Sequence, residues 1–122
     1  MTMGPPRIPG VLGGMGPAAT IDFMTKVLAC SQAAIGPDCR EQDGVRLIVD
    51  SNPAVPDRNG AVAGTGPSPG PVLASMARGL ERAGADFLVM PCNAAHAFVK
   101  DIKAATTLPF VHLITETAQF LM

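Results

Sequence analysis

Cys92 is the residue of this sequence whose type and position most clearly predict chemistry. It follows an apolar run, Phe87 to Met90, which suits a strand buried on both faces of a parallel sheet. Pro91 should end that strand because it cannot donate to a strand ladder. Asn93 is then a good N-cap for a helix over 94–105. Free N–H groups and a helix dipole at such a junction favour a thiolate and an anionic ligand, although a small buried hydrophobic residue is the alternative interpretation of Cys92.

Other candidate residues follow the other predicted strands. Met15 lies in a glycine-rich turn, and Ser51 and Asn52 follow the second apolar run. The Arg58 guanidinium has the geometry to hold both oxygens of a carboxylate, although a solvated surface charge is the commoner role of an arginine. Because parallel strands end at one edge of a sheet, we expect a single cleft suited to a small carboxylate. This cleft would contain Met15, Ser51, Asn52, Arg58, Cys92 and Asn93.

Four apolar runs predict strands, and the segments between them predict helices. Strands are expected over 8–13, 45–49, 87–90 and 108–114, and the main helices over 17–35, 72–83, 94–105 and 115–122. This alternation is typical of an α/β fold, here a doubly wound four-stranded parallel sheet with helices on both faces. The length of 122 residues predicts one domain over residues 1–122.

Three shorter patterns make the helix predictions more specific. Pro17 suits the first position of a helix, where its missing N–H costs nothing. Ile21, Met24 and Leu28 recur at helical spacing and predict one apolar face on that helix. Asp57 is a candidate cap for a short additional helix.

Composition excludes several classes of function. A formal net charge of -1 and the absence of Trp and Tyr argue against nucleic acid as a partner. Three cysteines without a CxxC pair predict neither a zinc site nor a disulfide framework. No apolar run is long enough to span a membrane or to form an export signal, so we expect a cytoplasmic protein without a membrane partner. The segment 14–19 matches G-x-G-x-x-A, but no acidic residue follows at the spacing of a dinucleotide site, so no cofactor is expected.

Three motifs resemble the aspartate/glutamate racemase family. They are Gly-Val-Leu-Gly-Gly-Met-Gly-Pro-Ala-Ala-Thr at 10–20, Ser-Asn-Pro-x-x-Pro-Asp-Arg at 51–58 and Ala-Gly-Ala-Asp-Phe-Leu-Val-Met-Pro-Cys-Asn-x-Ala-His at 83–96. They occur in the family's order and cover most of the chain. The resemblance implies a PLP-independent racemase of two similar α/β halves, often a homodimer, that interconverts the L- and D-forms of a small acidic amino acid, aspartate or glutamate.

The resemblance also implies roles for individual residues. Cys92 would be one of two thiols that face each other across the substrate α-carbon, so that one thiolate removes the α-proton and the opposite thiol delivers a proton to the other face. Asn52 and Asn93 resemble amides that contact the substrate, and Arg58 resembles the clamp on the side-chain carboxylate. Removal of the α-proton leaves a carbanion that is hard to form, so N–H donors around the α-carboxylate are expected.

The sequence departs from the family pattern at two points. Position 94 is Ala where the family usually has Thr, so a hydroxyl beside the thiol and the substrate is missing. The chain also resembles only the N-terminal half of a family member, and we expect the C-terminal half to be absent. Cys30 and Cys39 do not follow strands, so neither replaces the second family cysteine. A single copy would then be a half-site, weak or inactive alone, unless a second copy supplies another Cys92 in a homodimer.

Two alternative functions stay open, although the Pro-Asp-Arg and Gly-Gly-Met-Gly stretches speak against the first. A single-cysteine decarboxylase or a maleate-type cis–trans isomerase needs only one thiol, which would make an unpaired Cys92 natural. A non-catalytic domain that binds acidic amino acids would explain both Ala94 and the missing half.

Overall fold

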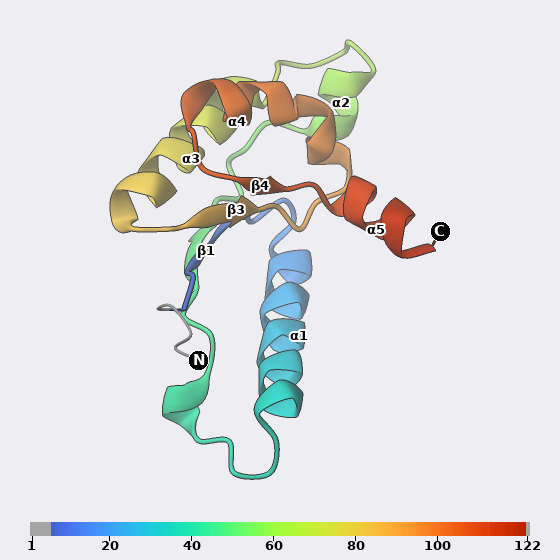
Figure 1. Ribbon diagram of the computed structural model, residues 1–122. Coiled ribbons are helices and arrows are strands. Elements are labelled where there is room, and N and C mark those ends of the chain that lie inside the picture. Colours follow the sequence, from blue (N-terminus) through green and yellow to red (C-terminus); the bar gives the residue numbers. More distant parts are fainter. Residues whose placement is uncertain (1–5, 122) are drawn as a thin grey trace.

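A four-stranded parallel sheet organises the chain in the computed structural model, which describes residues 6–121 (Figure 1). The strand order is β2-β1-β3-β4, as expected for a doubly wound α/β fold. Expectations that concern residues 1–5 or Met122 lie outside the described residues. The strands are β1 Pro9–Gly13, β2 Ile48–Ser51, β3 Phe87–Val89 and β4 Phe110–Val111. The α-helices are α1 Pro17–Ile35, α2 Arg58–Val62, α3 Gly70–Ala83, α4 Val99–Ala105 and α5 Leu113–Leu121, and 3₁₀ turns span Glu41–Asp43 (η1) and Ala94–Phe98 (η2).

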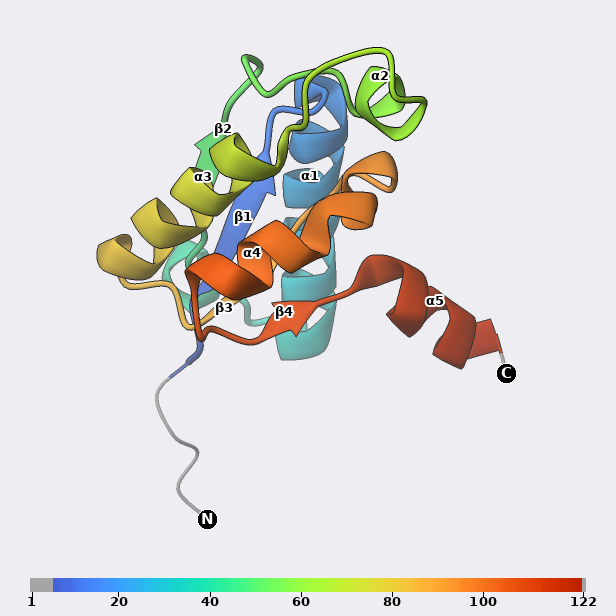
Figure 2. The ribbon, with the colours of Figure 1, turned by 90° about the horizontal axis from the view of Figure 1, so that it is seen from above.

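Helices α3 and α4 cover one face of the sheet, and α1 lies on the other (Figures 1 and 2). On α3, apolar residues recur every three or four positions, so one side of the helix can be buried. That side joins Leu12, Leu88 and Ile102 in the main apolar core, and these three side chains are fully buried. The α/β architecture predicted from the alternating pattern is therefore confirmed. Within residues 6–121, no helix has the length and apolar character required to cross a membrane.

Helix α1 packs much less closely than its sequence predicts. Pro17 occupies the first turn and Gly36 ends the helix, as expected. The predicted apolar face, however, is largely open: Ile21 is 65% exposed and Leu28 is 56% exposed, and Thr20 is the one buried residue of the helix. A hollow of about 550 Å³ separates this face from the segment 41–47. Helical periodicity shows which side chains share a face, but not whether another element covers them.

The observed strands are shorter than the predicted ones, and one is shifted. The second strand begins at Ile48 instead of Val45, because Gly10 of β1 pairs with Ile48 and the pairing then continues to Gly13 and Ser51. The last strand is limited to Phe110–Val111, since β3 offers only Leu88 and Val89 as partners. Helix α5 accordingly starts at Leu113, before the predicted Thr115. The available partners on neighbouring strands, which a single segment's sequence does not reveal, set these limits.

Candidate functional site

Cys92 lies beyond the carboxyl end of β3, half-buried, where the chain leaves the sheet. Its N–H donates to the Met90 carbonyl at 2.8 Å, so the backbone turns tightly at Pro91. The expected helix over 94–105 is instead a 3₁₀ turn followed by α4, which begins only at Val99. Asn93 does not cap it with its side chain, because its own backbone is already helical (φ -61°, ψ -47°) and its carbonyl accepts from the His96 N–H at 3.1 Å. The expected span 94–105 is therefore helical throughout, but the prediction of one continuous α-helix is wrong for 94–98.

A hollow of about 400 Å³ opens beside Cys92, which also packs against the apolar core. Part of its wall comes from the turn after β3, through Pro91, Cys92 and Asn93, and Leu113 at the start of α5 contributes as well. The rest comes from α1, through Ala19, Asp22, Phe23 and Lys26. The hollow thus lies where β3, α1 and α5 approach one another, at the edge of the sheet where ligands bind in open α/β folds.

The α1 residues of this wall were not among the predicted site residues. Lys26 and Asp22 form an ion pair at 2.7 Å, and its hydrogen bond raises the pKa of the Lys26 ammonium. Phe23 lies on the same side of the helix and is half-buried. Asp22 and Phe23 lie four and three residues before Lys26, so both share a helix side with it, and this spacing is the signal that could have identified them.

Met15, Ser51 and Asn52 do not line the Cys92 hollow. Met15 is buried in the apolar core, and Ser51 is exposed at the end of β2. The Asn52 side chain turns toward α3: its Oδ1 accepts from the Ala54 N–H at 3.0 Å, and it contributes to a separate hollow of about 370 Å³ beside Ser75 and Met76. The structure therefore does not bring all six expected residues together in one cleft.

Arg58, at the start of α2, is directed toward its own loop. Its Nη1 donates to the Val55 carbonyl at 3.3 Å and to the Pro56 carbonyl at 3.5 Å. Asp57 caps the helix as predicted, because its carboxylate accepts from the N–H groups of Asn59 and Gly60. The guanidinium is half-buried and absent from the wall of the Cys92 hollow, so it does not clamp a ligand there in this conformation.

Asn93 and Ala94 border a second hollow, of about 510 Å³, on the α2 side of the turn. Asn93 is exposed and lines both hollows, whereas Ala94 is half-buried and lines only the second. Asn93 is thus the one predicted amide that lies beside the thiol.

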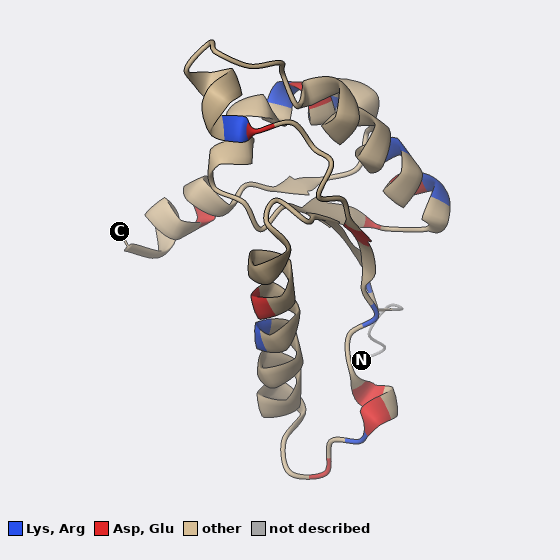
Figure 3. Ribbon diagram, turned by 180° about the vertical axis from the view of Figure 1, so that it is seen from behind, with Lys and Arg blue, Asp and Glu red and all other residues tan. Residues whose placement is uncertain are grey.

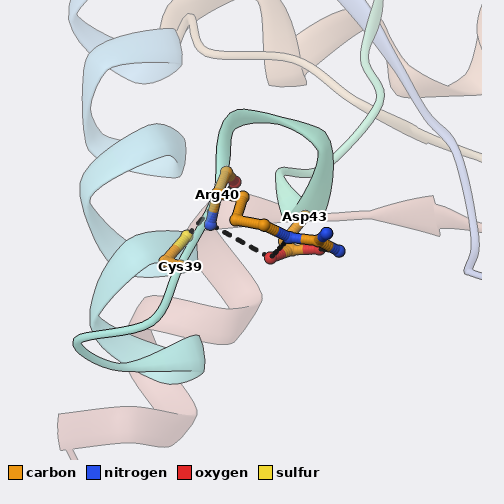
Figure 4. A network of polar contacts seen from close by, with 3 residues as sticks. All are labelled: Cys39, Arg40 and Asp43. Carbon is orange, nitrogen blue, oxygen red and sulfur yellow. Dashed lines mark hydrogen bonds and ion pairs between the residues drawn. The ribbon is translucent and has the colours of Figure 1, made fainter.

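The other two cysteines lie away from this edge. Cys39 belongs to the loop after α1, where its Sγ donates to the Arg40 carbonyl at 3.6 Å and Arg40 pairs with Asp43 at 3.2 Å (Figure 4). Figure 1 shows this loop at the opposite end of α1 from the β3 turn. Cys30 is exposed in the second half of α1 and lines neither hollow beside Cys92.

The family model described as Asp/Glu/Hydantoin racemase matches residues 12–122. The chain belongs to this family. It is 30% identical, over 88% of its length, to the broad specificity amino-acid racemase RacX of Bacillus subtilis (strain 168), and it covers 46% of that protein.

Solved structures of the racemase family share the fold. An aspartate racemase from Picrophilus torridus superposes with a TM-score of 0.83 and 32% identity, covering 94% of this chain and 47% of that one. An aspartate racemase homologue from Pyrococcus horikoshii OT3 has a TM-score of 0.75 at 24% identity, over 94% of this chain and 48% of that one, which supports the fold alone. The chain therefore spans about half the length of the relatives it matches.

Stability should depend on pH through His96, which is buried within the family motif. Burial lowers its pKa below the ordinary 6.5; the bond to the Cys92 carbonyl opposes this, and His112 lowers the pKa further. The folded state therefore binds fewer protons than the unfolded chain. The contribution of neutral His96 to the free energy of unfolding is therefore complete above pH 6.5. It is lost as the pH falls from 6.5 through the lower pKa of His96 in the folded state.

Urea unfolding at pH 7.5 and at pH 5.5 measures this effect. We expect the free energy of unfolding to be lower at pH 5.5, and we expect the difference between the two pH values to shrink in His96→Gln. An equal difference in the two proteins would contradict this assignment to His96.

Proposed function

We propose that this chain provides one acid–base side of a PLP-independent racemase site for a small acidic amino acid, with Cys92 as the group that exchanges the α-proton. The main supporting observation is that a half-buried cysteine lines a hollow at the carboxyl edge of the sheet, within a chain of the racemase family. Asn93 is proposed to contact the substrate there. The named racemase relatives support the reaction type and aspartate as the first substrate to test.

The charges around the hollow suit an amino acid. A zwitterion carries an ammonium and a carboxylate, and the wall offers a carboxylate from Asp22 and an ammonium from Lys26. These two groups form an exposed ion pair at 2.7 Å, which is weak enough for a ligand to exchange partners with it. We propose that this exchange accompanies substrate entry.

Among the three cysteines, all of which lie within residues 6–121, only Cys92 lines this hollow. One thiol can remove and return a proton on a single face of the α-carbon. We therefore expect the isolated chain to exchange the α-proton of one enantiomer for deuterium without inverting it. Inversion needs a second acid–base group on the opposite face.

The test is deuterium uptake into L- and D-aspartate in D₂O, followed by proton NMR, with chiral chromatography of the products. Uptake above the buffer rate in one enantiomer, with configuration kept, supports the proposal. Uptake at the buffer rate in both enantiomers contradicts it, and efficient inversion by a monomer contradicts the one-thiol arrangement. Malonates and maleate serve as substrates for the decarboxylase and isomerase alternatives.

We further propose that two copies complete the site when a twofold axis brings both Cys92 thiols to one substrate. Inversion of aspartate should then rise more steeply than the chain concentration, in step with the dimer fraction. Sedimentation velocity under assay conditions measures that fraction. A dimer without inversion, or inversion proportional to monomer, would contradict this arrangement.

A further inference from the structure

His96 is buried, with 5% of its surface exposed, four residues after the thiol. Its Nδ1 lies 2.8 Å from the Cys92 carbonyl oxygen. Its Nε2 lies 3.3 Å from the backbone nitrogen of Leu113, the first residue of α5. The ring therefore connects the turn that carries the thiol with a helix that also lines the thiol's hollow.

The two partners of the ring determine its protonation. A backbone N–H can only donate, so Nε2 must accept from Leu113 and carries no proton. A carbonyl oxygen can only accept, so Nδ1 must carry the proton and donate it to Cys92. The neutral Nδ1–H tautomer satisfies both bonds. The Nε2–H tautomer satisfies neither, and the imidazolium loses the bond from Leu113.

We propose that His96 is a positioning residue: as the neutral Nδ1–H tautomer, it fixes the Cys92 carbonyl against the N-terminus of α5, and so holds Cys92 in place at the edge of the hollow. The 3₁₀ turn makes this bond possible, because it brings the ring of His96 back over the carbonyl four residues earlier. The role in proton transfer rests on the proposed function of Cys92, whereas the bond itself does not.

The neighbouring rings support this orientation. Phe110 and His112 meet His96 edge-on, with ring centroids 5.6 Å and 4.8 Å away, so the imidazole is held from the β4 side. His112 bonds to α5 separately, since its Nδ1 accepts from the Thr115 N–H at 3.3 Å. His112 therefore provides a matched control: it contacts the same helix without contacting Cys92 through a hydrogen bond.

The first experiment is long-range ¹H–¹⁵N NMR of the wild-type side chains at pH 7.5. We expect the His96 ring to show the pattern of the Nδ1–H tautomer, with a protonated Nδ1 and an unprotonated Nε2. The Nε2–H pattern, or averaging between the two tautomers, would overturn the proposal. This measurement needs no variant and no activity.

The second experiment compares His96→Phe and His96→Gln. Phenylalanine preserves an aromatic ring without either bond, whereas the glutamine amide can donate to Cys92 and accept from Leu113. Loss of a neutral hydrogen bond should lower hydrogen-exchange protection of the Leu113 amide about 3- to 10-fold in His96→Phe, with recovery in His96→Gln. Unchanged protection in His96→Phe would overturn the tie to α5. If His96→Phe does not fold, the tautomer pattern and His96→Gln decide the question.

The third readout is deuterium uptake into aspartate by the same proteins. We expect uptake to fall at least about 10-fold in His96→Phe, to recover in His96→Gln, and to remain closer to wild type in His112→Phe. Equal loss in His96→Phe and His112→Phe would show that general loosening of α5 is responsible, and would overturn the positioning role. The NMR tautomer pattern and the exchange protection of the Leu113 amide could behave as expected while the wild type takes up no deuterium. In that case the proposed function of Cys92 would be wrong, but the hydrogen bonds of His96 would be supported.

Discussion

Replacing Cys92 by serine should reduce α-deuterium uptake at least about 100-fold, because a serine hydroxyl is not ionised near neutral pH and cannot act as the base. The change removes little volume at a half-buried position, so the fold should be retained. Uptake of deuterium into each enantiomer of aspartate, with circular dichroism and urea unfolding on the same samples, measures both effects.

Cys30→Ser and Cys39→Ser are the matched controls for this prediction. Both residues lie outside the Cys92 hollow, and we expect them to keep uptake within about twofold of wild type. Uptake that survives in Cys92→Ser would place the base elsewhere. Uptake that disappears equally in all three variants would indicate a general effect of cysteine loss.

Replacing Gly14 by alanine should destabilise the chain by about 3 to 5 kcal/mol, through backbone strain and a steric clash. Gly14 has a φ of +91°, and a Cβ at this position would lie 2.3 Å from the Asn52 backbone nitrogen. That nitrogen is fixed by its bond to the Gly13 carbonyl at 3.0 Å, and the Gly14 N–H is fixed by Thr20 Oγ1 at 2.8 Å. Neither chain segment can move away without breaking a bond.

Gly79→Ala is the matched control for the effect on stability. Gly79 lies within α3, and a Cβ there would meet no atom within 4 Å. Alanine should therefore stabilise this helix by about 0.5 to 1 kcal/mol. The free energies of unfolding in urea compare the two variants. A loss below about 1 kcal/mol in Gly14→Ala would mean that the turn between β1 and α1 relaxes more easily than its contacts indicate.

The sequence predicted the parts of the fold that depend on local pattern. The alternation of apolar runs and helices identified the parallel sheet, and Pro17 and Asp57 marked the correct helix starts. Cys92 was correctly expected just beyond the end of a buried strand. These features follow from periodicity, proline geometry and capping chemistry, all of which act between near neighbours.

The remaining features depend on contacts between distant residues. Asn93 is a residue type that often caps α-helices, but here it begins a 3₁₀ turn. In this turn, His96 bonds to the Cys92 carbonyl and to the Leu113 N–H. Asn52 follows a strand as expected, yet its side chain contacts Met76 of α3 and turns away from the thiol. A motif specifies which residues are present, while the orientation of each side chain depends on partners elsewhere in the chain.

The loose packing of α1 has a consequence for how the chain opens. Its first turn is anchored to the turn after β1, because Thr20 Oγ1 accepts from the Gly14 N–H, whereas Ile21, Met24 and Leu28 farther along have large exposed fractions. Figure 3 also shows little charge along this helix, which contains one acidic and one basic residue, Asp22 and Lys26. The helix can therefore fray from its C-terminal end while the sheet, α3 and α4 stay folded. Since Lys26, midway along α1, forms part of the wall beside Cys92, fraying that reaches Lys26 would vary the width of the proposed proton-transfer site without global unfolding.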